Sequence, residues 1–410
     1  MRSWPQVYLP PAPKGLQHKP LSLFDSYAQV KKEITEENIS SYVCGITPYD
    51  ATHLGHAATY LSFDLIHRYL LACGKKLYFV ENITDIDDPL LERAARDNQD
   101  WKELALSQID LFRTDMTTLR VIPPSHYEGV VESMAIIVES IQEYISADLT
   151  YKIADDIYLR LDKVPGFPEN LPLAIDEAIN IFAERGGDPT KTGKIHPLDP
   201  LLWRGKRQGE PSWEAPFGAG RPGWHVECVA IALAFLPKAS LSSITLQGGG
   251  SDLVFPHHYM TAMQSKALTK IDFASHYVHA GMIGLDGEKM SKSKGNLVFV
   301  SKLLESGVRP DAIRIALLLN HYQTDRMWSD DLLVKAQNLL VKLDQALAKM
   351  EVAPTFPVIS RITEALADNL DTPKVLQLIE LWCDETLSGS SGGSAGEMSR
   401  ALDTYLGIAL

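Results

Sequence analysis

The stretch from residue 41 to residue 81 constrains the fold more than any other part of this chain. Residues 41–46 have the character of a short buried strand, and residues 76–81 have the character of a second one. Apolar side chains recur at helical spacing between the two strands, and Gly74 closes that helical pattern. A strand, a helix and a strand within about 40 residues predict a βαβ crossover, and therefore a parallel sheet.

The segment His53-Leu-Gly-His56 falls at the N-terminus of the predicted helix. Free N–H groups and the positive end of the helix dipole attract phosphate at such a position. His53 and His56 would donate hydrogen bonds to a nucleoside triphosphate, and Gly55 would let the nucleotide approach the backbone closely. A four-residue pattern is weak evidence by itself, because two histidines at this place equally suit capping and packing.

A second segment, Lys-Met-Ser-Lys-Ser from Lys289 to Ser293, lies far downstream in a glycine-flanked stretch. Two lysines on such a loop, Lys289 and Lys292, would clamp the β and γ phosphates while the α phosphate is attacked. An exposed basic loop is the ordinary alternative for such a run. The five residues stand in this order and lie downstream of the first segment. This favours a catalytic role for both lysines, together with His53 and His56.

Composition limits the class of protein without naming it. The formal net charge is −13, which argues mildly against a protein built around nucleic-acid phosphates. The four cysteines show no disulfide framework, so a reducing cytoplasm is the expected location. No apolar run approaches the roughly 18 residues of a membrane helix, and no membrane partner is expected.

The chain divides into five expected units. They are an N-terminal arm at 1–40, the first half of an α/β unit at 41–145, an inserted module at 146–222, the second half of the α/β unit at 223–300, and a linking fold with a helical bundle at 301–410. The inserted module is rich in glycine and proline and is expected to be irregular rather than a sheet.

Further elements are expected inside these units. Strands are expected at 7–9, 21–24, 243–247 and 276–280, and a helix is expected at 224–232. Residues 85–145 are expected to be mostly helical around a break at Pro123-Pro124. Helices are also expected from Pro310 onward, with a flexible loop at 388–396.

Three residues widely separated in the sequence form a candidate metal site: Cys44, Cys228 and His257. Thiolate and imidazole ligands suit Zn²⁺, and three protein ligands leave one position for a substrate. Because no two of these ligands are close in sequence, the spacing equally fits buried free cysteines.

Six longer segments resemble the cysteinyl-tRNA synthetase superfamily over residues 42 to about 300. They are Tyr42–Asp50, Asn82–Asp88, Gly220–Cys228, Gly248–Asp252, Phe255–His258 and Lys289–Asn296. The resemblance implies an α/β fold: a class I synthetase-type, Rossmann-like parallel-sheet catalytic domain with an insertion and a C-terminal helical domain. It implies one Zn²⁺ per chain that binds the thiol of substrate cysteine, and Mg²⁺ that accompanies ATP.

The same resemblance implies a site for cysteinyl-adenylate. The residues implied to line that site are Cys44, Gly45, Ile46, Thr47, Thr59, Asn82, Ile83, Thr84, Trp224, Gly250, Ser251, Asp252 and Ile283. Two of these assignments keep an alternative, because Gly248–Asp252 also suits a tight turn and Trp224 also suits a core aromatic.

Departures from the synthetase pattern concern the acceptor. Thr261 stands where the synthetases place a fourth, glutamate ligand, and the chain after Ser293 is expected to leave little room for an anticodon-binding domain. Glu184-Arg185-Gly186-Gly187-Asp188-Pro189 resembles a signature of the mycothiol ligase branch of the superfamily, and so does Thr52–Tyr60. In that branch the acceptor is the amine of glucosaminyl-inositol.

The expected function is therefore ATP-dependent ligation of L-cysteine to glucosaminyl-inositol through a cysteinyl-adenylate. The protein is expected to be a monomer that needs no tRNA. A cysteinyl-tRNA synthetase is the first alternative, and a non-catalytic paralogue is the second. Arg185 and Asp188 either shape the acceptor site or serve the architecture of the insertion. The base that deprotonates the amine stays open among four acidic residues: Asp85, Asp87, Asp88 and Glu227.

Overall fold

A five-stranded parallel sheet forms the centre of the molecule in a computed structural model that describes residues 1–49, 52–285, 287–290 and 295–410. The strand order is β11 (Ala274–Ala280), β10 (Ile244–Gly250), β3 (Asn38–Val43), β4 (Lys76–Ile83) and β5 (His126–Gly129). Strands β3 and β4 pair in parallel from Asn38↔Lys76 to Val43↔Glu81. The predicted crossover and parallel sheet are therefore confirmed.

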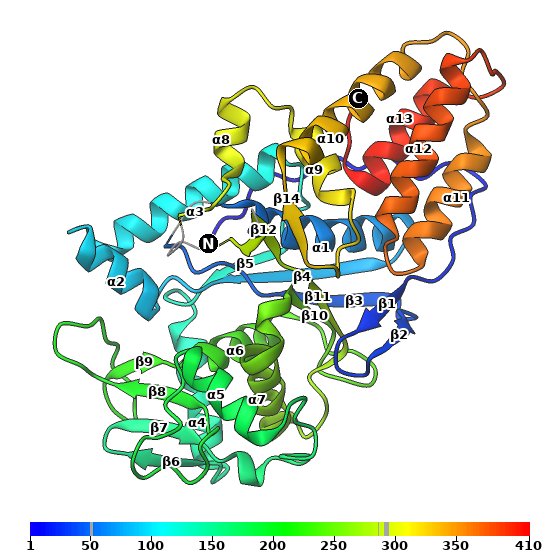
Figure 1. Ribbon diagram of the computed structural model, residues 1–410. Helices are drawn as coiled ribbons and strands as arrows, with labels where there is room; N and C mark the ends of the chain where they lie inside the picture. Colours follow the sequence, from blue (N-terminus) through cyan, green and yellow to red (C-terminus); the bar gives the residue numbers. More distant parts are fainter. Residues whose placement is uncertain (50–51, 286, 291–294) are drawn as a thin grey trace.

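Helices cover both faces of this sheet (Figure 1). One face packs against α1 (Leu54–Ala72) and α3 (Trp101–Thr118), whose apolar side chains share a core with Val43 and Val278. The other face packs against α4 (Met134–Ser146), α6 (Trp224–Phe235) and α7 (Tyr259–Thr269). The short α2 (Asp88–Arg96) packs on α3 at one end of the sheet.

The segment between α4 and α6 corrects the expectation of an irregular insertion. It contains a four-stranded antiparallel sheet, ordered β6 (Thr150–Ile153), β7 (Asp156–Leu159), β8 (Leu201–Gly205) and β9 (Gly220–Pro222). The module also holds η1 (Leu161–Lys163) and α5 (Ile175–Glu184). These strands have three to five residues each, so none is long enough to show a clear alternating pattern.

Two smaller expectations also differ from the structure. Residues 7–9 form no strand, whereas β1 (Ser22–Asp25) and β2 (Val30–Glu33) form a hairpin that meets the sheet edge at β11. The mostly helical stretch at 85–145 contains β5 shortly after Pro123-Pro124. Strand β5 has only four residues, and a proline pair marks a break in a helix without indicating whether a strand or a loop comes next.

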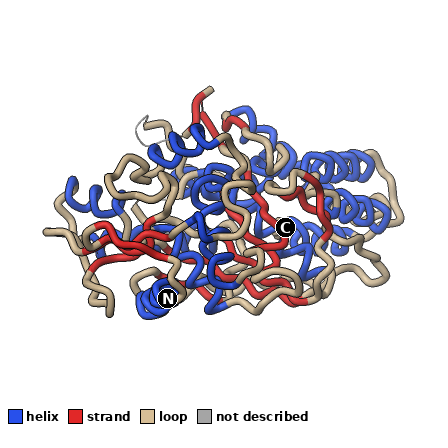
Figure 2. The backbone as a smooth tube through the Cα atoms, turned by 90° about the horizontal axis from the view of Figure 1, so that it is seen from below, coloured by secondary structure: helices blue, strands red, loops and turns tan. Residues whose placement is uncertain are grey.

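The C-terminal part is helical, as expected, and lies at the opposite end of the molecule from the four-stranded sheet (Figure 2). Its helices are α8 (Val300–Glu305), α9 (Pro310–Leu318), α10 (Asp330–Leu347), α11 (Phe356–Ala367), α12 (Thr372–Leu387) and α13 (Ala395–Leu406). A small sheet of β12 (Ile283–Leu285), β13 (Glu288–Lys289) and β14 (Arg326–Trp328) connects them to the central sheet.

A buried ion cluster fixes α1 against the C-terminal helices. The Asp64 carboxylate accepts hydrogen bonds from Arg68 Nε at 2.7 Å and from Arg314 Nη2 at 2.5 Å. Burial alone would raise the pKa of Asp64, but the two guanidinium groups outweigh burial and lower that pKa. Arg314 also donates to the carbonyl of Leu406 at 2.8 Å. Because removing one partner of a buried ion pair is costly, this cluster holds α1 in one position.

None of the helices in the described residues has both the length and the apolar character needed to cross a bilayer.

Candidate active site

A pocket opens where the carboxyl ends of β3 and β10 diverge. The chain leaves β3 toward β4 on one side and leaves β10 toward β11 on the other, so this is the switch point of the sheet, where ligands of open α/β folds bind. The pocket has a volume of about 450 Å³, within the range of small-molecule sites. Its walls are made by Cys44, Gly45, Ile46, Thr47, Tyr49, His53, Gly55, His56, Thr59, Tyr60, Asn82, Thr84, Trp224, Cys228, Gly250, Asp252, Leu253, His257, Gly281, Met282, Met290 and Leu297.

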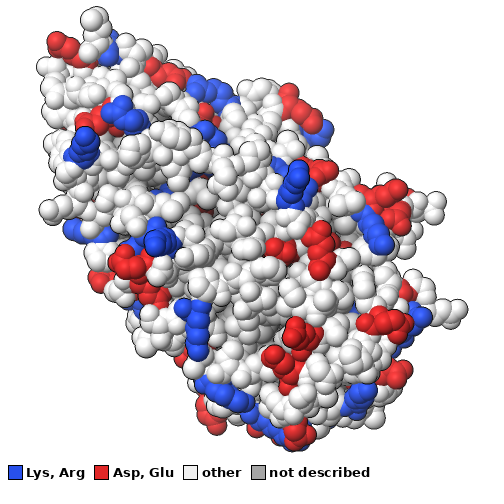
Figure 3. Space-filling model, turned by 180° about the vertical axis from the view of Figure 1, so that it is seen from behind, with Lys and Arg blue, Asp and Glu red and all other residues white. Residues whose placement is uncertain are grey.

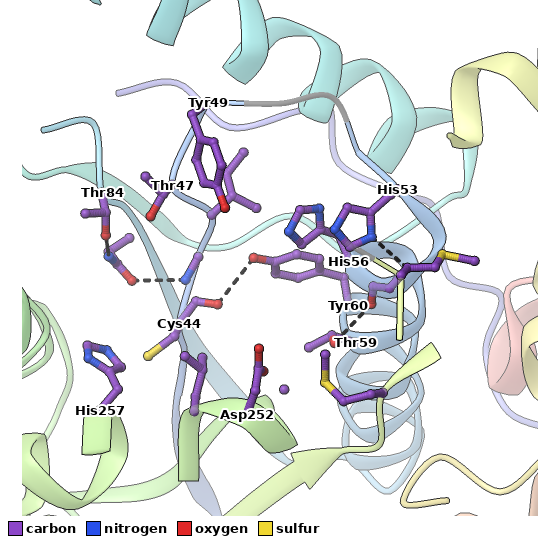
Figure 4. Close-up of a pocket in the computed structure, with 18 of the residues that line it drawn as sticks. Cys44, Thr47, Tyr49, His53, His56, Thr59, Tyr60, Thr84, Asp252 and His257 are labelled. Carbon is purple, nitrogen blue, oxygen red and sulfur yellow. Dashed lines mark hydrogen bonds between the residues drawn. The ribbon is translucent and has the colours of Figure 1, made fainter. Parts of the chain in front are cut away.

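One side of the pocket is the N-terminus of α1 (Figure 4). His53 is the N-cap, and its Nδ1 accepts a hydrogen bond from the N–H of Gly55 at 3.0 Å. The rings of His53 and His56 stack with centroids 3.9 Å apart. A Cβ on Gly55 would lie 2.7 Å from the His53 ring, so glycine at this position makes room for the cap. Both imidazoles therefore lie at the N-terminus of α1, where the positive end of the helix dipole attracts phosphate.

The segment after the second sequence motif lies directly against the first. His53 forms an isolated antiparallel bridge with Phe299, and the N–H of Leu54 donates to the carbonyl of Val298 at 2.9 Å. Met290 lines the pocket, and Lys289 belongs to β13. Lys292 lies outside the described residues. The fold thus brings the start of the second motif to the pocket, and the chain after the motif to the N-terminus of α1.

The wall beneath the pocket is built by close contacts between the segment after β3 and the end of β4. The N–H of Gly45 donates to Asn82 Oδ1 at 3.1 Å, and Asn82 Nδ2 donates to Thr84 Oγ1 at 3.2 Å. A Cβ on Gly45 would lie 1.5 Å from the carbonyl oxygen of Asn82, so no other residue fits there. Tyr60 Oη donates to the carbonyl of Cys44 at 3.2 Å and ties α1 to the same wall.

Sulfur and nitrogen donors meet at the bottom of the pocket. Cys44 Sγ and Cys228 Sγ are 4.0 Å apart, and Cys228 Sγ lies 3.3 Å from His257 Nε2. The ligand atoms of Cys44, His257 and His258 lie within 4.8 Å of one another. The structure therefore brings together the three predicted ligands, adds His258, and forms a cluster that could hold a metal ion.

His258 begins a chain of hydrogen bonds that leaves the pocket. Its Nε2 lies 3.1 Å from Cys44 Sγ, and its Nδ1 lies 2.7 Å from His279 Nε2. His279 Nδ1 lies 2.9 Å from the hydroxyl of Ser26. Each neutral imidazole has one N–H, so the chain is polarised in one direction throughout. When Cys44 carries no proton, Ser26 donates to His279, His279 donates to His258, and His258 donates to the sulfur.

Burial sets the protonation of this cluster. It lowers the pKa of His258 well below the usual range and the pKa of His279 to about 3, so both rings are neutral. A hydrogen bond from Cys44 lowers the pKa of Cys228, and the neighbouring His257 lowers it further. His257 Nδ1 lies 2.9 Å from His225 Nδ1, whose pKa burial also lowers. The contact between the two Nδ1 atoms orients the His257 ring, as the hydrogen-bond partners of metal-binding histidines do.

The remaining predicted residues fall into two groups. Thr47, Thr59, Trp224, Gly250 and Asp252 line the pocket, and Trp224 stacks on His257 with ring centroids 4.1 Å apart. The side chains of Ile83 and Ile283 lie in the hydrophobic core, which leaves the main chain of Ile283 for its expected contact with adenine, and Ser251 is in η2 (Ser251–Leu253) without lining the pocket.

Several wall residues were not among the predicted site residues. Tyr49 and Tyr60 lie inside Tyr42–Asp50 and Thr52–Tyr60, and the resemblance of those two segments could have indicated them. Leu253 has ordinary core character, and Gly281 and Met282 stand directly before the predicted Ile283. Thr261, which stands at the position of the synthetase glutamate, donates its hydroxyl to the carbonyl of His257 at 2.8 Å. This hydroxyl is therefore engaged by the backbone of the neighbouring turn.

The segment Glu184–Pro189 begins at the last residue of α5. Some of its residues pack inside the insertion, and one contacts the edge of the pocket. The Asp188 carboxylate accepts hydrogen bonds from Tyr158 and from Lys194 Nζ, the latter at 2.8 Å. A Cβ on Gly187 would lie 2.4 Å from the Phe182 ring. Gly187 and Asp188 therefore hold the insertion together. Arg185 is exposed and donates from Nη1 to the carbonyl of Asp252 at 3.3 Å, at the edge of the pocket.

The four acidic residues that were candidates for the base differ in their surroundings. Asp87 caps α2 by accepting from the N–H of Asp88 at 2.8 Å, and Asp88 forms ion pairs with Arg204 and Arg221. Burial raises the pKa of Asp85 to about 6 and the pKa of Glu227 well above its usual range. None of the four lines the pocket as the described residues form it.

This fold and pocket define a nucleotide-dependent catalytic domain of the class I synthetase type. A family model described as tRNA synthetases class I (C) catalytic domain matches residues 30–338. The methionyl-tRNA synthetase of Mycobacterium tuberculosis, solved with methionyl-adenylate, superposes with a TM-score of 0.63 at 17% identity, over 91% of this chain and 89% of that one. The agnB2 LeuRS of Agrobacterium radiobacter K84, in a ternary complex with tRNA and LeuAMS, gives 0.61 at 12% identity, over 92% and 85%.

Curated relatives match along the entire chain. The L-cysteine:1D-myo-inositol 2-amino-2-deoxy-alpha-D-glucopyranoside ligase of Gordonia bronchialis is 48% identical, and the protein of the same name from Nocardia farcinica is 49% identical, with all of this chain and all of each relative covered. The chain belongs to the family of these ligases, within the class I synthetase superfamily.

Proposed function

We propose that this protein ligates L-cysteine to the amine of glucosaminyl-inositol at the expense of ATP, a step of mycothiol biosynthesis. Cysteine carboxylate attacks the α phosphorus of ATP, and pyrophosphate leaves. The amine then attacks the carbonyl of cysteinyl-adenylate, AMP leaves, and the amine proton passes to a base. The observation that carries the proposal is one pocket with a sulfur-and-imidazole cluster at its bottom and a phosphate-attracting helix N-terminus at its side.

The donor atoms at the bottom of the pocket fit a zinc ion. Two thiolates on tetrahedral zinc lie about 3.8 Å apart when each Zn–S bond is about 2.3 Å. The 4.0 Å between Cys44 and Cys228 and the 3.3 Å between Cys228 and His257 are close to that geometry. Bound zinc supplies a soft Lewis acid that selects a substrate thiol over a hydroxyl.

The opposite side of the pocket suits the triphosphate. His53 and His56 face the pocket from the start of α1 and would donate to the phosphate oxygens as charge develops on them. Asp252 points into the pocket from the β10 end, where its carboxylate would accept hydrogen bonds from ribose hydroxyls. Mg²⁺ is expected to accompany ATP, and Lys289 and Lys292 are proposed to neutralise the leaving pyrophosphate.

The acceptor is proposed to be a small amino sugar rather than tRNA. On the face shown in Figure 3, acidic and basic side chains are interspersed, and no continuous basic surface crosses this face. A protein that binds tRNA neutralises many phosphates with such a surface. The ligases of Gordonia and Nocardia also match this chain over their whole length, which supports the same acceptor.

An acceptor assay tests the proposal. Purified protein is incubated with zinc, ATP and L-cysteine, and then with glucosaminyl-inositol or with tRNA in separate reactions. The proposal predicts a cysteine amide of glucosaminyl-inositol together with AMP and pyrophosphate. Formation of cysteinyl-tRNA, with no amide, would establish the synthetase alternative. Absence of any cysteine-dependent exchange between pyrophosphate and ATP would support a non-catalytic paralogue.

His258 is expected to strengthen zinc binding without being required for the fold of the pocket. Its Nε2 lies 3.1 Å from Cys44 Sγ and donates to that sulfur when Cys44 is a thiolate, and loss of such a partner typically weakens metal affinity about 10- to 100-fold. His258→Phe should lower zinc affinity by that range in a titration against a chromogenic chelator, whereas His258→Gln, which keeps a donor, should stay near wild type. Equal zinc affinity in wild type and H258F would refute this role.

A further inference from the structure

Arg185 is the residue of the Glu184–Pro189 segment whose side chain contacts the pocket wall, at the carbonyl of Asp252. The other distinctive residues of this segment are engaged inside the insertion, where Asp188 binds Lys194 and Gly187 packs against Phe182. Arg185 lies at the C-terminal end of α5, which packs against η3 (Val254–His258), the segment that carries His257. The insertion therefore places one guanidinium group beside the pocket wall.

Most of the hydrogen-bonding capacity of this guanidinium is left for a ligand. Within the described part of the chain, its one hydrogen bond runs from Nη1 to the carbonyl of Asp252 at 3.3 Å, and no carboxylate pairs with it. A guanidinium has five N–H donors in a rigid plane. The exposed side chain thus presents further donors at the edge formed by Asp252, whose own side chain points into the pocket.

The chemistry of the acceptor decides which of its rings meets Arg185. The inference about the acceptor rests on the proposed function. The amine is on the glucosamine ring and must reach the adenylate carbonyl inside the pocket. The inositol ring is attached at the neighbouring carbon and has no reacting atom, so contacts to it can lie outside the reacting centre, at the pocket wall beside Arg185. An uncharged cyclitol offers only hydroxyl groups, and several convergent N–H donors are suited to bind them.

We propose that Arg185 recognises the inositol ring of the acceptor through hydrogen bonds to its hydroxyl groups, and thereby determines acceptor specificity. The contact with the Asp252 carbonyl holds the guanidinium at the rim. Binding energy from this non-reacting ring favours the pseudodisaccharide over a simple amino sugar. Adenylate formation does not involve the inositol ring and is independent of Arg185.

An acceptor without the inositol ring distinguishes recognition of that ring from a general structural role of Arg185. Arg185→Ala is compared with wild type in amide formation from glucosaminyl-inositol and from methyl 2-amino-2-deoxy-α-D-glucopyranoside, which lacks the inositol ring. We expect kcat/KM for glucosaminyl-inositol to fall about tenfold or more, while kcat/KM for the methyl glycoside stays within about twofold. Arg160→Ala, on the same insertion with its guanidinium bound to Asp162 at 2.6 Å, is the matched control and should change neither value.

The outcomes distinguish this proposal from its alternatives. Cysteine-dependent pyrophosphate exchange by R185A should equal that of wild type. Slower exchange would mean that Arg185 positions Asp252 for the adenylate, and equal losses with both acceptors would mean that it supports the pocket in general; either result overturns the proposal. If wild type forms no amide with glucosaminyl-inositol but does exchange pyrophosphate, the proposed acceptor is wrong, and not merely the role of Arg185.

Discussion

Replacing Cys228 by serine is expected to remove bound zinc and cysteine activation together. Cys228 is buried, lies 4.0 Å from Cys44 and 3.3 Å from His257, and has a lowered pKa that favours the thiolate. A serine hydroxyl has a far higher pKa and is a harder ligand, so it does not replace a thiolate on zinc. We expect zinc content to fall from about one ion per chain to about a tenth of that. Cysteine-dependent pyrophosphate exchange should fall at least about 100-fold.

A second cysteine provides the control for this experiment. Cys73 caps the C-terminal end of α1, away from the pocket, and Cys73→Ser removes a thiol without touching the cluster. This variant should keep its zinc and its exchange rate. Zinc content is measured by mass spectrometry of the purified protein, and thermal denaturation checks that both variants fold. Unchanged zinc in folded C228S would refute the ligand assignment.

Replacing His56 by asparagine is expected to slow adenylation and leave cysteine binding intact. His56 stacks on His53 at the N-terminus of α1, on the phosphate side of the pocket and away from the cysteine cluster. Removal of one preorganised donor to developing charge typically costs about 100- to 1000-fold in rate. The maximal rate of pyrophosphate exchange should fall by that range, while the Kd of cysteine in calorimetry should stay within about threefold.

His126→Asn is the matched control, because His126 is exposed on the edge strand β5 and lies outside the pocket wall. It should leave exchange unchanged. A parallel loss of cysteine affinity and exchange rate in H56N would mean that His56 supports the pocket as a whole instead of acting on phosphate.

The central sheet could be predicted because its signals are local and strong. Apolar periodicity and Gly74 define α1, and the strands on either side are buried over most of their length, as expected for strands of a parallel sheet. The sheet of the insertion was missed for the opposite reason. Its strands are short, antiparallel and separated by glycine and proline, so their pairing depends on contacts between distant segments.

The site was partly predictable. His53 and His56 are three residues apart at the start of one helix, so their proximity follows from local structure. Cys44 and Cys228 are 184 residues apart in sequence and meet because β3 and the start of α6 converge at the same edge of the sheet. Only the family resemblance indicated that meeting. The chain of hydrogen bonds from His258 through His279 to Ser26 joins three segments that are separate in the sequence. No pattern in the sequence indicates this chain.

Oxygen transfer from labelled cysteine tests the proposed reaction most directly. Cysteine with ¹⁸O in both carboxyl oxygens is incubated with zinc, ATP and glucosaminyl-inositol, and the products are separated for mass spectrometry. Attack of the carboxylate on the α phosphorus, followed by amide formation, predicts one ¹⁸O in AMP and one in the amide carbonyl. Label in orthophosphate with release of ADP, or label-free AMP beside the amide, would contradict activation of cysteine as its adenylate in this pocket.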